Sequence, residues 1–222
     1  MLAGISLYSV SVWILPVLIA ITFHEAAHAY VARYFGDDTA SQLGRVSLNP
    51  LKHIDPLGTV ILPGLLILSN APFIFGYAKP VPVNFAALRS PRADMAWVAI
   101  AGPAINVVLA IAAALALHVV GLVPADASQW MFDNLKNALI INCVLAVFNM
   151  FPLPPLDGGR IAVSILPDFV ARPLARLEPY GMLILIALII VAPMAGLNYV
   201  SPAISAATGF LIRLVLQVTG NG

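Results

Sequence analysis

The sequence predicts an all-α polytopic membrane protein, and three observations support this fold class. Of the 222 residues, 61% are hydrophobic and only 9% are charged, whereas soluble domains carry about a quarter charged residues. The mean hydropathy is +0.96. Apolar segments of about 20 residues, the length of a membrane-spanning helix, recur along the chain. They lie at 8–32, 57–76, 94–121, 131–151 and 180–199, with a weaker one at 203–219.

These segments fill most of the chain and leave no room for a separate soluble domain. We therefore expect one membrane-embedded domain over residues 1–222. The net charge of +1 gives no reason to expect a nucleic-acid partner. The single cysteine, Cys143, lies in an apolar run and is expected to be a small core residue.

The first span contains the sequence HEAAH at 24–28. An isolated ionisable side chain in a membrane helix costs at least a few kcal/mol. Residues i and i+4 share one helix face, so His24 and His28 can bind one metal ion. Glu25 lies about 100° round the helix and can reach a water on that ion. This is the HExxH pattern of zinc hydrolases, and a polar packing or proton-relay cluster is the alternative.

The segment 57–76 decides the topology. Both neighbouring connections are basic, with Arg33, Arg45 and Lys52 before it and Lys79, Arg89 and Arg92 after it. Lys and Arg in short loops favour the cytoplasmic side. Because the segment contains Pro63 and Gly64, we expect it to be re-entrant or to lie along the surface. The spans at 8–32 and 131–151 then run in the same direction, and HEAAH lies toward the cytoplasmic end.

A catalytic zinc needs a third protein ligand. Asp157 directly follows a span, in PLPPLDGG, where prolines end the helix and glycines allow a tight bend. An ordinary interfacial turn would have a similar sequence. His53 and Asp55, in a polar loop on the same face, are alternative ligands. His118 lies near the outer end of its span and is expected to be an interfacial residue.

Together these residues resemble the site-2 protease family of intramembrane zinc metalloproteases. NMFPLPPLDGG at 149–159 is similar to the family's Asn-x-x-Pro-x-Pro-x-Leu-Asp-Gly motif, and AGPAIN at 101–106 is similar to its Gly-x-x-x-Asn pattern. Asn106 in that pattern is a weaker candidate for a site residue, since packing explains it equally. The resemblance covers about residues 15–165 and is to short bacterial members without a PDZ or CBS domain.

The resemblance implies a three-helix catalytic core, taken as 8–165, and accessory C-terminal spans at 174–219. It also implies a short β or re-entrant region between the first two core helices. Within that region PVPVNF at 80–85 is expected to form a strand edge that receives an unwound substrate.

The family also implies roles for single residues. His24, His28 and Asp157 would bind one zinc ion per chain. Glu25 would be the catalytic glutamate, and Asn149 would hold the substrate backbone or the oxyanion.

The expected function is that of a zinc-dependent intramembrane endopeptidase. Its substrates would be transmembrane proteins. The protein is expected to be a multi-pass protein of the inner cell membrane, with its active site toward the cytoplasm. A membrane metal transporter and a non-catalytic membrane chaperone on the same scaffold are the alternatives.

Overall fold

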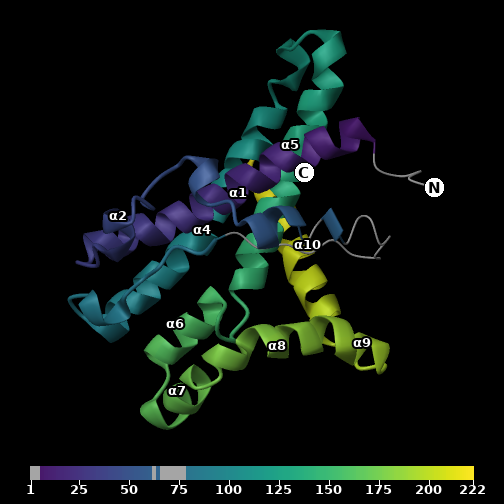
Figure 1. The fold of residues 1–222 in the computed structure, drawn as a ribbon. Helices are drawn as coiled ribbons and strands as arrows, with labels where there is room; N and C mark the ends of the chain where they lie inside the picture. Colours follow the sequence, from purple (N-terminus) through teal and green to yellow (C-terminus); the bar gives the residue numbers. More distant parts are fainter. Residues whose placement is uncertain (1–5, 62–63, 66–78) are drawn as a thin grey trace.

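The computed structural model describes residues 6–61, 64–65 and 79–222, and all regular structure in these residues is helical (Figure 1). The longer helices are α1 (Leu7–Tyr34), α4 (Pro91–Leu117), α5 (Ala125–Asn149), α6 (Asp157–Ile165), α7 (Asp168–Ala175), α8 (Gly181–Ile186) and α10 (Val200–Val218). The short α-helices and 3-10 or π segments are α2 (Thr39–Gln42), η1 (Pro50–Lys52), η2 (Pro56–Ile61), η3 (Phe85–Ala87), η4 (Val120–Leu122), η5 (Glu178–Tyr180), η6 (Ala187–Val191) and α9 (Ala192–Met194).

Five helical stretches of the described chain are long and apolar enough to cross a membrane, so the chain is a multi-pass membrane protein. They are Leu7–Tyr34, Pro91–Leu117, Ala125–Asn149, Asp168–Met194 and Val200–Val218. The expected segment at 180–199 ends earlier than predicted, because Gly196 adopts a φ of 81° that ends a helix. It also begins earlier, because α7 continues into α8 through η5.

Helices α1, α4 and α5 pack against one another and form the core that positions the site. α1 and α5 run in the same direction: Tyr8 of α1 donates to Asp133 of α5 at 2.6 Å, and four residues further along both helices Asn137 donates to the Val12 carbonyl at 3.0 Å. α4 runs in the opposite direction, because the backbone N–H of Arg89, just before α4, donates to the Phe35 carbonyl at the end of α1. Figure 1 shows α8 and α9 leading away from this core and α10 returning toward α5.

The connection from α1 to α4 begins and ends at the same end of the core. The predicted re-entrant segment 57–76 lies mostly outside the described residues. Its flanks are described, and they meet: the backbone N–H of Lys79 donates to the His53 carbonyl at 3.0 Å, and Arg45 Nη2 donates to the Lys79 carbonyl at 2.7 Å. Both flanks therefore lie on one side of the bundle, as the basic residues in them predicted.

The predicted strand in PVPVNF is wrong, because no strand forms in residues 6–61, 64–65 and 79–222. Pro80 and Pro82 have no N–H to donate to a sheet. The N–H groups of Val81 and Asn84 donate instead to the carboxylates of Glu25 and Asp37, each at 2.7 Å. Carboxylates from other parts of the chain have thus taken the place of a strand partner.

Small side chains allow the core helices to approach closely. The residues of α1 and α4 that are at most 1% exposed include Ala20, Ala26, Ala29, Ala32, Ala99, Asn106, Ala110 and Ala114. Small residues at such interfaces bring helix backbones together. A polar side chain at these interfaces therefore meets the neighbouring helix directly.

Candidate metal centre

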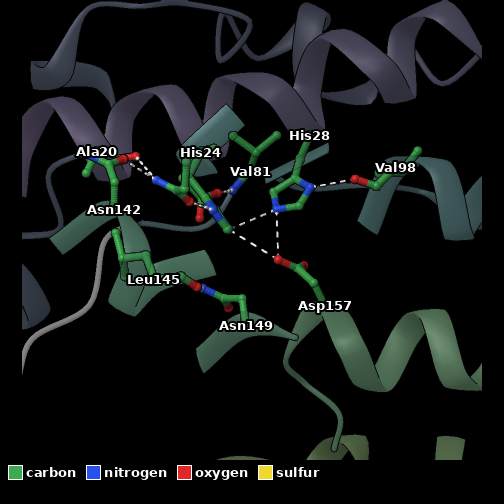
Figure 2. A network of polar contacts seen from close by, with 11 residues as sticks. Ala20, His24, His28, Val81, Val98, Asn142, Leu145, Asn149 and Asp157 are labelled. Atoms are coloured by element: carbon green, nitrogen blue, oxygen red, sulfur yellow. Dashed lines mark hydrogen bonds and ion pairs between the residues drawn. The ribbon is translucent and has the colours of Figure 1, made fainter. Parts of the chain in front are cut away.

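The two histidines of HEAAH and Asp157 form one buried group. His24 and His28 lie one turn apart on α1, and Asp157 is the first residue of α6. The histidine Nε2 atoms are 3.1 Å apart. Asp157 Oδ2 lies 3.2 Å from His24 Nε2 and 3.4 Å from His28 Nε2. Figure 2 shows the three side chains directed toward one another, as predicted from the sequence.

Hydrogen bonds to the other ring nitrogens fix which nitrogen of each histidine carries the proton. His28 Nδ1 lies 2.7 Å from the Val98 carbonyl of α4, which can only accept, so Nδ1 is protonated. His24 Nδ1 lies 2.6 Å from Asn106 Oδ1, also on α4, and donates to it. When each ring is neutral, its Nε2 then carries the lone pair, which is the form in which a histidine binds a metal ion.

Three lone pairs consequently face one another in the buried group. Asp157 Oδ2 is buried and has no hydrogen-bond donor among the described residues, because neither Nε2 carries a proton. Buried polar atoms are rarely left in this state. A cation between the three atoms would satisfy all of them.

The spacing of the three atoms suits zinc. In a tetrahedral site the ligand atoms are separated by about 1.63 times the metal–ligand bond, or about 3.3 Å for zinc bonds of about 2.0–2.1 Å. The observed separations of 3.1, 3.2 and 3.4 Å lie on both sides of this value. The residues present therefore fit a zinc ion with a fourth position left for water or substrate.

The loop that carries Asp157 packs tightly because of its glycines. A Cβ on Gly158 would lie 2.2 Å from the Met150 carbonyl oxygen, and one on Gly159 would lie 2.1 Å from Pro154 N. These close contacts fix the turn that brings the Asp157 carboxylate against the two histidines of α1. A carboxyl that serves as a metal ligand has to be deprotonated.

Helix α4 closes one side of the group at Gly102. A Cβ on this residue would lie 2.5 Å from His24 Cε1, 2.5 Å from His28 Nε2 and 2.6 Å from His24 Nε2. Only a glycine allows the α4 backbone to come this close to both imidazoles. The Gly-x-x-x-Asn pattern at 102–106 did not by itself predict this role for the glycine.

A backbone group in the connection between α1 and α4 holds the Glu25 side chain. Its Oε2 accepts the backbone N–H of Val81 at 2.7 Å. The Val81 side chain is buried in a cluster with Ala29 of α1 and Ala40 of α2. The segment after Lys79 thus fixes one oxygen of the glutamate that follows His24.

The other predicted residues lie elsewhere. Asn149 is the last residue of α5, and its Nδ2 donates to the Leu145 carbonyl of the same helix at 3.0 Å (Figure 2). His53 Nε2 bonds the Ser47 carbonyl at 2.8 Å, and Asp55 accepts from the Gly58 N–H at 2.7 Å. His118 Nε2 bonds the Thr219 carbonyl at 2.7 Å. His53, Asp55 and His118 are therefore not part of the three-residue group.

Asn142 was not predicted from the sequence, and Asn106 was predicted only as a weaker candidate. Both are buried, at 2% and 0% exposure, and Asn106 Nδ2 donates to Asn142 Oδ1 at 2.7 Å. The available signal was a polar residue within an apolar span, which usually indicates a functional or interhelical contact. Asn142 in IINCVLAVFN carries that signal.

An apolar groove of about 700 Å³ lies between α4, α5 and α10. Pro103, next to Gly102, lines it on α4, and Met150 and Phe151 line it where the chain leads from α5 toward Asp157. Ala203, Ala207 and Leu211 of α10 form the opposite wall. The groove therefore adjoins the two segments that build the ligand group.

The chain is similar in sequence to known proteins. The model of the family described as Peptidase family M50 matches residues 117–192. The protein named "Putative zinc metalloprotease YwhC" of Bacillus subtilis is 37% identical over 205 residues, which cover 90% of this chain and 89% of that protein. "Putative zinc metalloprotease Rip2" of Mycolicibacterium smegmatis is 32% identical over 174 residues, covering 78% of this chain and 64% of that protein. The Rip2 of Mycobacterium tuberculosis strain H37Rv is 26% identical over 194 residues, covering 87% and 71%. No solved structure matches.

Proposed function

The chain belongs to peptidase family M50, the site-2 protease family of zinc metalloproteases, and on that premise we propose that it hydrolyses peptide bonds in or near transmembrane segments of membrane proteins. The observation that carries the proposal is the convergence of three metal-ligand atoms inside a core of apolar helices, directly beside Glu25. Buried ligands of this kind are expensive in a membrane protein unless they serve a function.

In the proposed site His24, His28 and Asp157 hold one zinc ion per chain. When bound, zinc supplies Lewis acidity, which makes a water acidic enough to lose a proton near neutral pH and stabilises negative charge on a peptide carbonyl. The other ring nitrogens of the two histidines contact Asn106 Oδ1 and the Val98 carbonyl of α4. The protein therefore supplies a preorganised site for hydrolysis.

Glu25 is the proposed general base. It accepts a proton from the attacking water and returns it to the departing amine, a role that typically contributes 10²–10⁴-fold in rate. The Val81 N–H holds one carboxylate oxygen and so restricts where the other can point. Asn149 is proposed to donate its amide to the substrate, which requires Nδ2 to leave the Leu145 carbonyl.

A transmembrane helix is a difficult substrate because its own hydrogen bonds protect its amides. It has to unwind locally before Glu25 and the zinc ligands can reach a peptide bond. The apolar groove between α4, α5 and α10 offers a wall for the intact part of such a helix, next to the ligand group. We therefore propose membrane proteins, rather than soluble peptides, as the substrate class.

A metal transporter would place ligands along a path through the membrane. Within the part of the chain that the structure describes, His24, His28 and Asp157 form the single group of three or more potential ligands. One compact group favours a fixed catalytic ion over a transported one.

Glu25→Gln tests the proposal in proteoliposomes that contain a single-span substrate protein. We expect the cleavage rate to fall by about 10²–10⁴-fold while zinc content stays at that of the unmodified protein. Glu178→Gln is the matched control, because this exposed glutamate pairs with Arg160 and is not part of the three-residue group. Cleavage at the unmodified rate by zinc-loaded Glu25→Gln would refute the proposed base. Zinc flux that survives this substitution, without cleavage by the unmodified protein, would support a transporter instead.

A further inference from the structure

A chain of amide hydrogen bonds runs from His24 through all three core helices. His24 Nδ1 donates to Asn106 Oδ1 at 2.6 Å. Asn106 Nδ2 donates to Asn142 Oδ1 at 2.7 Å and to the Ala20 carbonyl at 3.3 Å. Asn142 Nδ2 in turn donates to the Ala138 carbonyl at 2.8 Å. Figure 2 shows Ala20 and Asn142 beside His24 in this network.

The direction of these hydrogen bonds is fixed by the backbone groups at their ends. The carbonyls of Ala20 and Ala138 can only accept, so each asparagine turns its NH₂ toward them. Rotating the Asn106 amide by half a turn would place its oxygen against two acceptors, the Ala20 carbonyl and Asn142 Oδ1. It would also point NH₂ at His24. The observed orientation therefore leaves Asn106 Oδ1 as an acceptor for a proton on His24 Nδ1.

We propose that Asn106, itself oriented by Asn142, is a positioning residue that keeps the proton of His24 on Nδ1 and the lone pair of Nε2 in the ligand group. The proposal rests on the proposed function, because it takes His24 to be a zinc ligand. Partners behind a metal-binding histidine fix its tautomer and ring orientation, and their loss typically costs 10–100-fold in metal affinity.

His28 does not need such a side chain, because the Val98 backbone carbonyl accepts its Nδ1 proton. A side-chain mutation can therefore remove the acceptor at His24 Nδ1 but not the acceptor at His28 Nδ1. The His24 tautomer depends on side chains at 106 and 142, whereas the His28 tautomer depends on the α4 backbone. Substitutions at Asn106 should consequently affect one ligand and leave the other in place.

The alternative role for Asn106 is to join helices, as a buried amide commonly does. Asn137 is a matched control for that role. It lies on α5, is 8% exposed, and donates Nδ2 to the Val12 carbonyl of α1 at 3.0 Å. Asn137→Leu thus removes a buried interhelical amide hydrogen bond without changing a partner of His24.

The experiment compares Asn106→Leu, Asn106→Asp and Asn137→Leu with the unmodified protein in detergent. Zinc affinity is measured by competition with a chromophoric chelator. We expect Asn106→Leu to bind zinc about 10–100-fold more weakly. Asn106→Asp keeps an acceptor oxygen opposite His24 Nδ1, and its second oxygen has to be protonated to face the Ala20 carbonyl and Asn142 Oδ1. In that form the variant should bind zinc within about threefold of the unmodified affinity, well short of the loss expected for Asn106→Leu. Asn137→Leu should bind zinc as the unmodified protein does. Equal affinity in Asn106→Leu, or an equal loss in Asn137→Leu, would overturn the proposal.

A second measurement does not depend on zinc. The chain has four histidines, so ¹⁵N-histidine labelling and His24→Gln identify the His24 signals in the zinc-free protein above pH 8. The ring ¹⁵N shifts should show the Nδ1-protonated tautomer in the unmodified protein and in Asn106→Asp, and a tautomer mixture in Asn106→Leu. If Asn106→Leu does not fold, Asn142→Leu replaces it, with a smaller shift toward the mixture expected. An unmodified protein that binds no zinc would refute the proposed function, whereas an unchanged tautomer in the folded variants would refute this inference alone.

Discussion

Gly102→Ala tests the close approach of α4 to the ligand histidines. The new methyl carbon would lie 2.5 Å from His28 Nε2, 2.5 Å from His24 Cε1 and 2.6 Å from His24 Nε2. Non-bonded carbon and nitrogen atoms are comfortable at about 3.5 Å. The methyl therefore overlaps both imidazoles by about 1 Å, on the side from which α4 covers them.

The expected loss falls on zinc binding more than on folding. Overpacking a core costs about 1–3 kcal/mol, and alanine recovers about 0.5–1 kcal/mol relative to glycine inside a helix. The net destabilisation is then about 0–2.5 kcal/mol. Zinc ligands must be placed to within about 0.2 Å, so moving an imidazole by about 1 Å removes it as a ligand. Losing a hydrogen-bond partner behind a ligand typically costs 10–100-fold in metal affinity. Displacing the ligand itself should cost more, so we expect zinc affinity to fall at least about 100-fold.

The assay is chelator competition for zinc in detergent, with thermal unfolding of the same samples. Gly209→Ala is the matched control, because Gly209 lies in α10 and its nearest neighbour to an added Cβ, Arg213 Nη1, is at 3.6 Å. This variant should retain zinc affinity. Unmodified zinc affinity in a folded Gly102→Ala protein would refute the packing of α4 against the histidines.

Two further substitutions test other parts of the site. Asp157→Asn should lower zinc affinity by at least about 100-fold, because a neutral amide replaces the anionic ligand. The control Asp168→Asn changes an exposed carboxylate and should leave zinc affinity unchanged. A full zinc content in Asp157→Asn would contradict the ligand assignment. Val81→Pro removes the N–H that binds Glu25 and should lower kcat about tenfold or more with zinc content unchanged, since hydrogen bonds to charged groups contribute about 1.5–3 kcal/mol. Val81→Ala keeps the N–H and should keep kcat, so equal rates in the two variants would show that this contact has no role.

The helical spans could be predicted because they depend on local composition. The five membrane-length stretches follow from apolar runs. The predicted span at 180–199 ran too far, because the turn at Gly196 depends on its backbone conformation and not on apolar composition. The strand predicted at 80–85 failed for a long-range reason. The N–H groups of Val81 and Asn84 found carboxylates on or after α1. A β-branched pattern does not reveal which acceptor a backbone group will meet.

The convergence of His24, His28 and Asp157 could be predicted from the sequence, but the residues that pack behind them could not. His24 and His28 share a helix face by spacing alone, and the Pro- and Gly-rich loop before α6 indicated that Asp157 could turn back. Asn142 stood out only as a polar residue within an apolar span, and its role depends on the packing of α5 against Asn106 of α4. The need for glycine at 102 likewise follows from a contact between helices, which spacing within one helix cannot show.

The direction of the core helices bears on the side of the bilayer to which the site opens. The α1 end that carries the two histidines also meets the start of α4, where Arg92 donates to the Ser164 carbonyl. The opposite end carries the Tyr8–Asp133 pair. Short basic connections face the cytoplasm, and the connections at the histidine end are the basic ones. We therefore propose that the site opens to the cytoplasm. Water would then reach it over a shorter distance than from the other side, because HEAAH lies in the second half of α1.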